Sequence, residues 1–274
     1  MSAEGLRDYV FGPGFFWDVL RTSEVPMAHL FSHGVGRSFA PGEDVARQGE
    51  PVRRVFVVHS GYLKVFARSR DGEEILSAIF GPRDLVGAAS SALRPPTWRH
   101  TVRAAGEVRV TAIPRRYFRI FLLDHPRVAL ELNGYIAHLL SDSDQRFLDM
   151  STRGIEARLS RLLATLAERF GYEVDGGTEI AAPMTQKELA SFIGASEVSV
   201  SRALQQLRRD GVVETGYRRL LVRDLPALEA GTVAVGRDSD RGSDADGAHG
   251  SGRRRREAAL EQGQVRRQAR GAAR

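Results

Sequence analysis

The chain has 274 residues, a formal net charge of +6, 42% hydrophobic residues and no cysteine. This length suffices for two modest domains with cores of their own, and the absence of cysteine excludes disulfides, thiolate metal sites and cysteine-ligated iron–sulfur clusters. Since no apolar run reaches membrane-spanning length and the N-terminus lacks a secretory signal, we expect a cytoplasmic protein without membrane contacts.

The first part of the chain is predicted to form an arm followed by β-structure. Residues 1–20 interleave aromatic residues with glycines, and we expect an N-terminal arm there. From residue 35 to 114, short β-prone runs alternate with turn signals such as Asp71-Gly72. Strands this short and turned this often predict a small antiparallel roll, which we assign to residues 21–125.

A long helix is predicted at residues 126–151, beginning at Pro126. At heptad spacing this helix has an apolar seam that we expect to meet the same helix of a second subunit. The seam consists of Leu132, Ile136, Leu139, Ser143 and Met150, with Ala129 and Arg146 at the same spacing. Leu140 and Phe147 form a second apolar edge. Apolar groups on two sides predict two partners, the roll and a second subunit; a core helix of a monomer is the alternative.

The pattern changes twice more before the end of the chain. Residues 151–154 interrupt the helical pattern, and Gly154 is our hinge candidate because glycine lowers helix propensity. Residues 155–170 resume as an amphipathic helix that opens the next predicted domain, residues 152–230. The remaining residues, 231–274, are rich in Gly, Arg, Asp, Ser and Ala, so we expect a disordered tail.

Residues 184–222 contain the most informative pattern. Thr185 and Glu188 form a capping box, which predicts that a helix follows. Gly194 allows a tight turn into a second helix capped by Ser196, and two short β-like runs come after it. A helix, a tight turn, a second helix and a hairpin form a winged helix-turn-helix, which lays its second helix in a DNA major groove.

The exposed side of that second helix holds the candidate DNA contacts. Arg202 lies midway along it, and arginine can pair bidentately with guanine. The other candidate base contacts are Glu197, Val198 and Ser201. Phosphate contacts are expected from the helix starts and the wing, namely from Gln186, Ser196, Ser199, Arg218 and Arg219. A helical hairpin whose arginines only solvate a surface is the alternative.

The order of several short motifs resembles a known family. The motifs F-x-P-G-E, Q-G-E, S-G-x-L/V-x-V, D-G-E-E and G-x-x-D-L-V-G are similar to the cyclic-nucleotide-binding roll of the Crp/Fnr transcription regulators. The helix-turn-helix resembles that family's DNA-binding domain, and the likeness covers residues 39–222. The resemblance implies an α+β fold with an antiparallel β-roll sensor domain, a long dimerisation helix and a C-terminal winged helix-turn-helix.

The resemblance also implies a function. The chain is expected to be a transcription regulator, not an enzyme, that binds a near-palindromic double-stranded DNA site as a homodimer, with RNA polymerase as a further partner. Arg202 matches the family's guanine-reading arginine. Val198 stands where typical members have an acidic residue, which puts the family's usual half-site in doubt.

The predicted effector pocket departs from the family. Cyclic-AMP binders hold the ribose with a glutamate and the phosphate with an arginine, and the resemblance places Ala88 and Trp98 at those positions. The methyl group of Ala88 cannot accept a hydrogen bond from the ribose hydroxyl, and the indole of Trp98 cannot neutralise the charge of a phosphate. Arg99 should point to the opposite face, unless the preceding loop is remodelled. We therefore assign no cofactor, expect that a cyclic nucleotide such as cyclic AMP does not control the chain in the usual way, and leave another small-molecule effector open. The degenerate pocket comprises Gly87, Ala88, Trp98, Arg99, Ser143 and Asp144.

Two other classes of function compete with this hypothesis. A cupin-like β-roll enzyme needs histidines clustered with a carboxylate, yet His59 and His100 lie on separate predicted strands, so we expect no metal site. A small-molecule-sensing module with little DNA specificity is the other, and the intact helix caps argue against it. Haem sensing through His29, His33 or His138 stays open.

Overall fold

The computed structural model of the chain describes residues 27–216 and 219–230. Three parts of the sequence-based hypothesis therefore lie outside the described residues: the N-terminal arm at residues 1–20, the tail at residues 231–274, and the wing residue Arg218.

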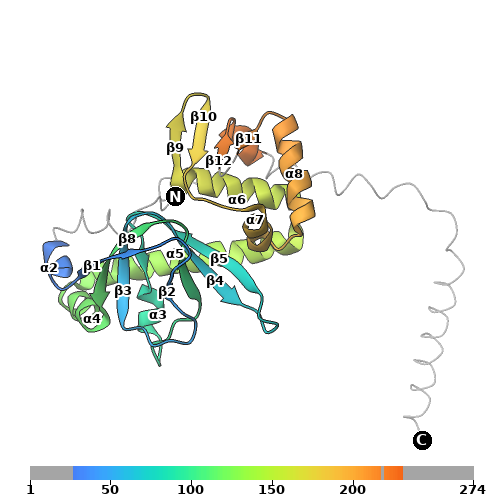
Figure 1. Cartoon of the computed structure of the whole chain (residues 1–274). Coiled ribbons are helices and arrows are strands. Elements are labelled where there is room, and N and C mark those ends of the chain that lie inside the picture. The colour runs from blue at the N-terminus through green and yellow to red at the C-terminus, as the bar shows by residue number, and fades with distance from the viewer. Residues whose placement is uncertain (1–26, 217–218, 231–274) are drawn as a thin grey trace, which may run out of the picture. The chain divides into compact units, whose positions relative to one another are not determined.

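Two four-stranded antiparallel sheets form a roll, as predicted (Figure 1). The first sheet has the strand order β1 (Val35–Phe39), β8 (Val108–Pro114), β3 (Arg54–Ser60) and β6 (Leu85–Val86). The second has the order β2 (Asp44–Ala46), β7 (Thr101–Ala104), β4 (Leu63–Arg68) and β5 (Glu74–Phe80). Two short helices were not predicted: α2 (Met27–Ser32) precedes the roll, and α3 (Ala88–Ala92) lies between β6 and β7.

Strand β3 is buried on both faces and separates two cores. Phe56 and Val58 belong to the cluster inside the roll, which also contains Trp98. Val55 and Val57 alternate with them and belong to a cluster on the opposite face. Because successive side chains of a strand point to opposite faces, a continuous apolar run is what a strand between two cores requires.

Helices α4 (Arg115–Asp124) and α5 (Pro126–Thr152) contribute to this second cluster. Leu132 is buried in it, and Ile136 and Leu139 pack against it. These three residues of the predicted dimer seam thus face the chain's own core. The prediction that they meet a second subunit is therefore corrected. Two apolar stripes run along α5, and the one containing Leu132 is used within the chain.

The break after α5 lies where the hinge was expected. Arg153 and Gly154 have extended backbone conformations, and α6 (Ile155–Phe170) begins directly after them. The buried carboxylate of Asp149 pairs with Arg153 Nε at 2.9 Å and with Arg161 Nη1 at 3.2 Å. Ion pairs to residues on both sides of Gly154 therefore brace this break.

The C-terminal part combines helices with a third four-stranded antiparallel sheet, whose strand order is β11, β12, β10, β9. Its elements after α6 are β9 (Gly171–Val174), β10 (Gly177–Ile180), α7 (Gln186–Ile193), α8 (Glu197–Arg209), β11 (Val213–Gly216) and β12 (Arg219–Val222). Strand β9 was not predicted from the sequence, although the dipeptide Asp175-Gly176 is a hairpin signal. This strand pairs with β10 in an antiparallel hairpin.

The core of the C-terminal part continues onto the roll. Leu76 and Ile79 of β5 belong to the same buried cluster as Leu163, Leu189 and Val200 of helices α6, α7 and α8. Figure 1 shows α7 lying between β5 and α6. No helix among the described residues is long and apolar enough to cross a membrane.

Candidate nucleic-acid interface

Helices α7 and α8 have the caps that their sequence predicts. The Thr185 hydroxyl accepts a hydrogen bond from the Glu188 amide at 3.2 Å, and the Glu188 carboxylate accepts one from the Thr185 amide at 2.8 Å, which completes the capping box. Gly194 closes α7 with a φ of 63°, in the left-handed region that glycine favours. The Ser196 hydroxyl then accepts from the Ser199 amide at 3.1 Å and caps α8.

Helix α8 has one buried and one free face. The buried face packs into the C-terminal core through Val200, Ala203, Leu204 and Leu207. Of the four candidate base contacts, Glu197, Val198 and Arg202 are exposed and Ser201 is partly exposed. An amphipathic helix of 13 residues, packed on one side only, can offer the other side to a groove.

The candidate phosphate contacts differ in their surroundings. Gln186 is exposed at the first residue of α7, and the hydroxyls of Ser196 and Ser199 bond each other at 2.9 Å at the start of α8. Arg219 pairs with Glu179 of β10, with 2.6 Å between Nε and Oε2. A DNA phosphate would have to share Arg219 with that carboxylate. Local sequence patterns could not predict this ion pair, because its two residues are 40 positions apart.

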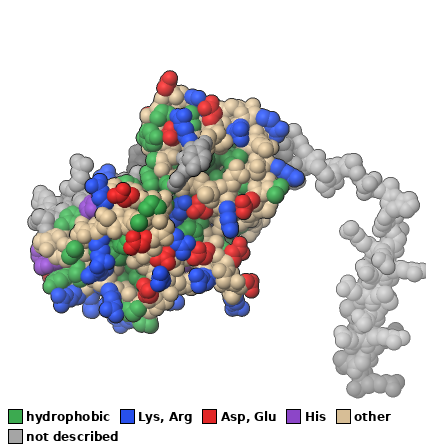
Figure 2. All heavy atoms as spheres, viewed as in Figure 1, with side chains coloured by type: hydrophobic (Ala, Val, Ile, Leu, Met, Phe, Trp, Pro, Cys, Tyr) green, Lys and Arg blue, Asp and Glu red, His purple; other side chains and the backbone are tan. Residues whose placement is uncertain are grey.

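Sequence reasoning missed another basic residue on the free side of α8. Arg209 is exposed and follows Arg202 by seven residues, which is close to two helical turns and places both on one face. In Figure 2 basic side chains gather along the edge of the molecule that α8 forms. The seven-residue spacing from Arg202 was the sequence feature that could have identified Arg209 as a further residue of this face.

In the roll, the indole of Trp98 lies against Gly87, another residue of the predicted effector pocket. Gly87 has a φ of 90°, and a Cβ atom added there would come within 2.5 Å of Trp98 Cη2. Trp98 is 7% exposed and stacks on Phe56 at a ring distance of 6.1 Å, while Ala88 is buried. Arg99 is exposed, in agreement with the expectation, but residues 98–100 precede β7 and lie outside the strand, so strand alternation is not the cause. Ser143 and Asp144 are exposed on α5.

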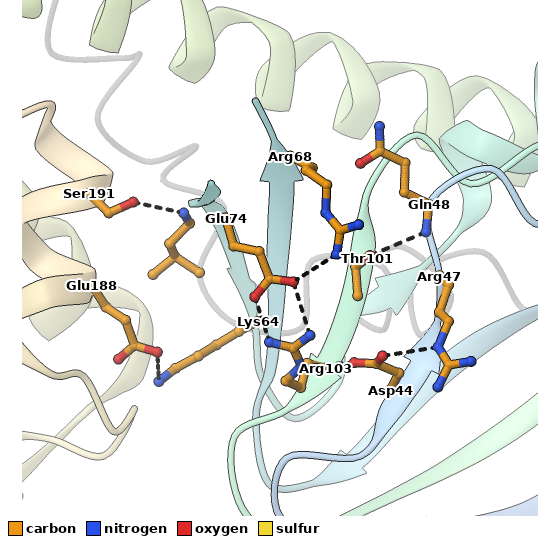
Figure 3. Close-up of polar contacts among 11 residues, drawn as sticks. Asp44, Arg47, Gln48, Lys64, Arg68, Glu74, Thr101, Arg103, Glu188 and Ser191 are labelled. Carbon is orange, nitrogen blue, oxygen red and sulfur yellow. Dashed lines mark hydrogen bonds and ion pairs between the residues drawn. The ribbon is translucent and has the colours of Figure 1, made fainter. Parts of the chain in front are cut away.

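Polar contacts join the roll to the first helix of the helix-turn-helix (Figure 3). Lys64 of β4 is buried, and its ammonium group lies 2.6 Å from Oε1 of Glu188, the carboxylate that also completes the capping box. The amide of Leu76 donates to the Ser191 hydroxyl at 3.0 Å. These contacts link residues more than a hundred positions apart, so local sequence patterns could not reveal them.

A second polar cluster holds the strands of the roll together. Arg103 of β7 lies between Glu74 of β5 and Asp44 of β2 and donates to both at 2.8 Å (Figure 3). Hydrogen bonds from Arg103 lower the pKa of Glu74, more than burial raises it. The ionised carboxylate is therefore the form that this cluster stabilises.

Comparison with known proteins matches both halves of this architecture. A family model described as a cyclic nucleotide-binding domain matches residues 36–125, and one described as a Crp-like helix-turn-helix domain matches residues 157–230. The chain is 29% identical to the "CRP-like cAMP-activated global transcriptional regulator" of Mycobacterium tuberculosis strain H37Rv, over 69% of this chain and 84% of that protein. It is 26% identical to the "Transcriptional activator protein FnrA" of Stutzerimonas stutzeri, over 72% of this chain and 82% of that protein.

A solved structure has a similar fold. FixK2 from Bradyrhizobium japonicum aligns with a TM-score of 0.64 and 23% identity, covering 72% of this chain and 96% of that chain. The sheet roll and the capped helix-turn-helix thus coincide with the residues that the two family models match. The chain belongs to the Crp/Fnr family of DNA-binding transcription regulators.

Proposed function

We propose that this regulator binds a near-palindromic DNA site as a homodimer, with α8 of each subunit in the major groove. The capped, one-sided packing of α8 supports this most directly, because it leaves Arg202 and Val198 free on one face. Two such helices related by a two-fold axis would enter successive grooves about 34 Å apart. RNA polymerase is a further proposed partner.

The exposed stripe of α5 supports the homodimer. Leu130, Leu140, Phe147 and Leu148 are large apolar residues that are more than half exposed. Leu130, Leu140 and Phe147 are spaced like the a and d positions of a two-helix contact, Leu148 adjoins them, and apolar patches of this kind mark protein interfaces. We therefore move the proposed seam to this stripe. Ser143 and Met150, from the seam first predicted, are also exposed.

The roll is proposed not to respond to cyclic AMP in the usual way. Trp98 occupies the space directly beside Gly87, and Arg99 is exposed. A bound phosphate would need a donor or cation where the indole now stacks on Phe56.

No observation favours the competing classes. His59 bonds the Thr111 hydroxyl at 2.6 Å, and His138 pairs with Asp142, whereas His33 stacks on Tyr117. Within residues 27–216 and 219–230, no three His, Asp or Glu side chains are grouped so that they could hold a metal ion. The contacts of these histidines are those of ordinary surface residues.

The test is selection of bound duplexes from a genomic DNA pool, with and without cyclic AMP, followed by affinity measurements on the selected site. Arg202→Ala should cost about 1–3 kcal/mol and relax the preference at one base pair of each half-site. Arg208→Ala is the matched control, since it removes the same charge from an exposed position on another face of α8. Undiminished sequence preference in the Arg202 variant would contradict the assignment, and selection that depends on cyclic AMP would contradict the proposed effector behaviour.

A further inference from the structure

A cavity of about 140 Å³ lies where β5, α5, α6 and α7 meet. Its apolar lining includes Leu139 of α5, Leu162 and Leu166 of α6, and Phe192 of α7. None of the effector-pocket residues expected from the sequence lines this cavity. A volume of this size can accommodate an apolar body about as large as one benzene ring.

Arginines dominate the charged lining of the cavity. They are Arg146 of α5 and Arg158, Arg161 and Arg169 of α6. Two carboxylates face them, and both have partners: Asp149 pairs with Arg153 and Arg161, and Asp142 pairs with His138 at 3.4 Å. The lining therefore has an excess of positive charge.

Two of these guanidinium groups have donors that the described residues do not satisfy. Nε of Arg158 and Nε of Arg169 are buried without a hydrogen-bond acceptor. One other nitrogen of each group is engaged, since Arg158 Nη1 donates to the Ile193 carbonyl at 2.7 Å and Arg169 Nη2 to the Asp84 carboxylate at 3.4 Å. A buried donor without an acceptor costs free energy, and a negative charge in the adjacent cavity would offset part of that cost electrostatically.

Arg146 adds a repulsion that an anion would relieve. Its guanidinium donates to the Ser77 carbonyl at 2.8 Å and lies over the Phe192 ring at 4.7 Å. Burial lowers the pKa of Arg146, and the positive charge of Arg169 lowers it further, against the opposing effect of Asp142. Like charges converging on a desolvated cavity are stabilised by a negative charge between them.

We propose that this cavity binds a small organic anion, with its carboxylate or phosphate group held by the arginines and a benzene-sized apolar body against the Leu and Phe side chains. The walls come from elements on both sides of Gly154, so such a ligand would fix the helix-turn-helix against the roll and change the affinity for DNA. That regulatory consequence rests on the proposed function; binding to the cavity does not.

The test is isothermal titration calorimetry of the full chain with phenyl phosphate, without DNA. Inorganic phosphate and benzyl alcohol are the comparison probes, because each has one half of the proposed chemistry. Phenyl phosphate should bind saturably below about 1 mM and at least tenfold more tightly than either comparison probe. Absence of saturable binding, or equal binding of either comparison probe, would overturn the proposal.

Arginine variants connect that binding to the cavity. Arg158→Gln and Arg146→Gln, on two different helices, should each weaken phenyl phosphate at least tenfold, because each removes a charge-assisted contact. Arg153→Gln is the matched control: Arg153 pairs with the same Asp149 as Arg161 but does not line the cavity. Thermal unfolding identifies which variants are folded, and equal loss in the control would overturn the assignment.

A separate measurement distinguishes this inference from the proposed function. DNA affinity with and without phenyl phosphate should differ severalfold in the original chain and not in the Arg158→Gln variant. If phenyl phosphate binds in the calorimeter but the protein binds DNA without sequence preference, the cavity assignment holds and the proposed function is contradicted. If DNA binding is sequence-selective but phenyl phosphate does not bind, only the cavity assignment is contradicted.

Discussion

Among single residues, Arg103 stabilises the roll by joining three strands. It donates to Glu74 and to Asp44, and about a third of each side chain or less is exposed, so solvent screens these ion pairs only in part. Arg103→Gln should therefore lower the free energy of unfolding at neutral pH by about 2 kcal/mol. Arg109→Gln is a suitable control, because Arg109 is exposed and bonds only a neutral partner, the hydroxyl of Ser60.

The pH dependence of this effect has a definite sign. The folded-state pKa of Glu74 lies below its ordinary value of 4.5, chiefly through the hydrogen bonds from Arg103. Its stabilising contribution is therefore complete above about pH 4.5 and is lost as the pH falls through the lowered pKa. Urea unfolding at a series of pH values should show the difference between Arg103→Gln and the original chain narrowing in acid. A constant difference would mean that the ion pairs do not cause the loss.

Single residues also show what the sequence could and could not predict. Opposite orientations of Trp98 and Arg99 were expected from strand alternation, but both residues precede β7, so the burial of one and the exposure of the other have another cause. The contact of Trp98 with Gly87 had no such signal, nor did the pairing of Lys64 with Glu188. Contacts of this kind depend on how distant elements meet, and local patterns do not encode that.

At the scale of elements, the turn between α7 and α8 depends on one glycine. A Cβ atom at Gly194 would lie 3.5 Å from Met150 Cε, which is ordinary contact, so its positive φ sets the cost of a substitution. Gly194→Ala should destabilise the chain by about 1–2 kcal/mol in thermal or urea unfolding. Gly106→Ala should be near neutral, because a Cβ atom there meets nothing within 4 Å. Equal effects of the two substitutions would show that the left-handed backbone at Gly194 is not needed.

Elements were predictable where their ends have chemical signals. The capping box, Gly194 and Ser196 gave the bounds of α7 and α8, and Pro126 gave the start of α5. Helix α3 was missed because its sequence, Ala-Ala-Ser-Ser-Ala, is short and lacks apolar periodicity. Its N-terminal cap is a left-handed glycine without a side-chain cap bond, so the usual start signal is also missing.

At the scale of the whole molecule, the two apolar stripes of α5 have different roles. Periodicity identified the Leu132 stripe and, at Leu140 and Phe147, part of a second one, but it assigned the Leu132 stripe to the second subunit, because heptad spacing does not show which stripe meets the chain's own roll. Burial resolves this: Leu132 is in the core, whereas Phe147 is 70% exposed. The exposed stripe is therefore the surface that a second copy would cover.

Phe147→Glu tests this assignment by placing a charge in the proposed interface. Burying an unpaired carboxylate between two helices is unfavourable, so the variant should weaken dimerisation by about 2 kcal/mol or more. Sedimentation velocity over a range of concentrations measures the change. Leu123→Glu on α4 makes the same substitution of an apolar residue by a charge at an almost equal exposure of 69%, and it should leave the dimer intact.

The DNA affinity of the same variants extends the prediction from assembly to function. If two copies of α8 reach successive grooves only as a dimer, Phe147→Glu should lose preference for a two-half-site duplex over a single half-site, whereas Leu123→Glu should keep it. The fold of each variant can be checked by circular dichroism, because neither side chain belongs to a core cluster. A Phe147→Glu protein that still dimerises would show that α5 pairs through another face. A monomeric variant that still prefers the two-half-site duplex would show that DNA itself brings the two subunits together.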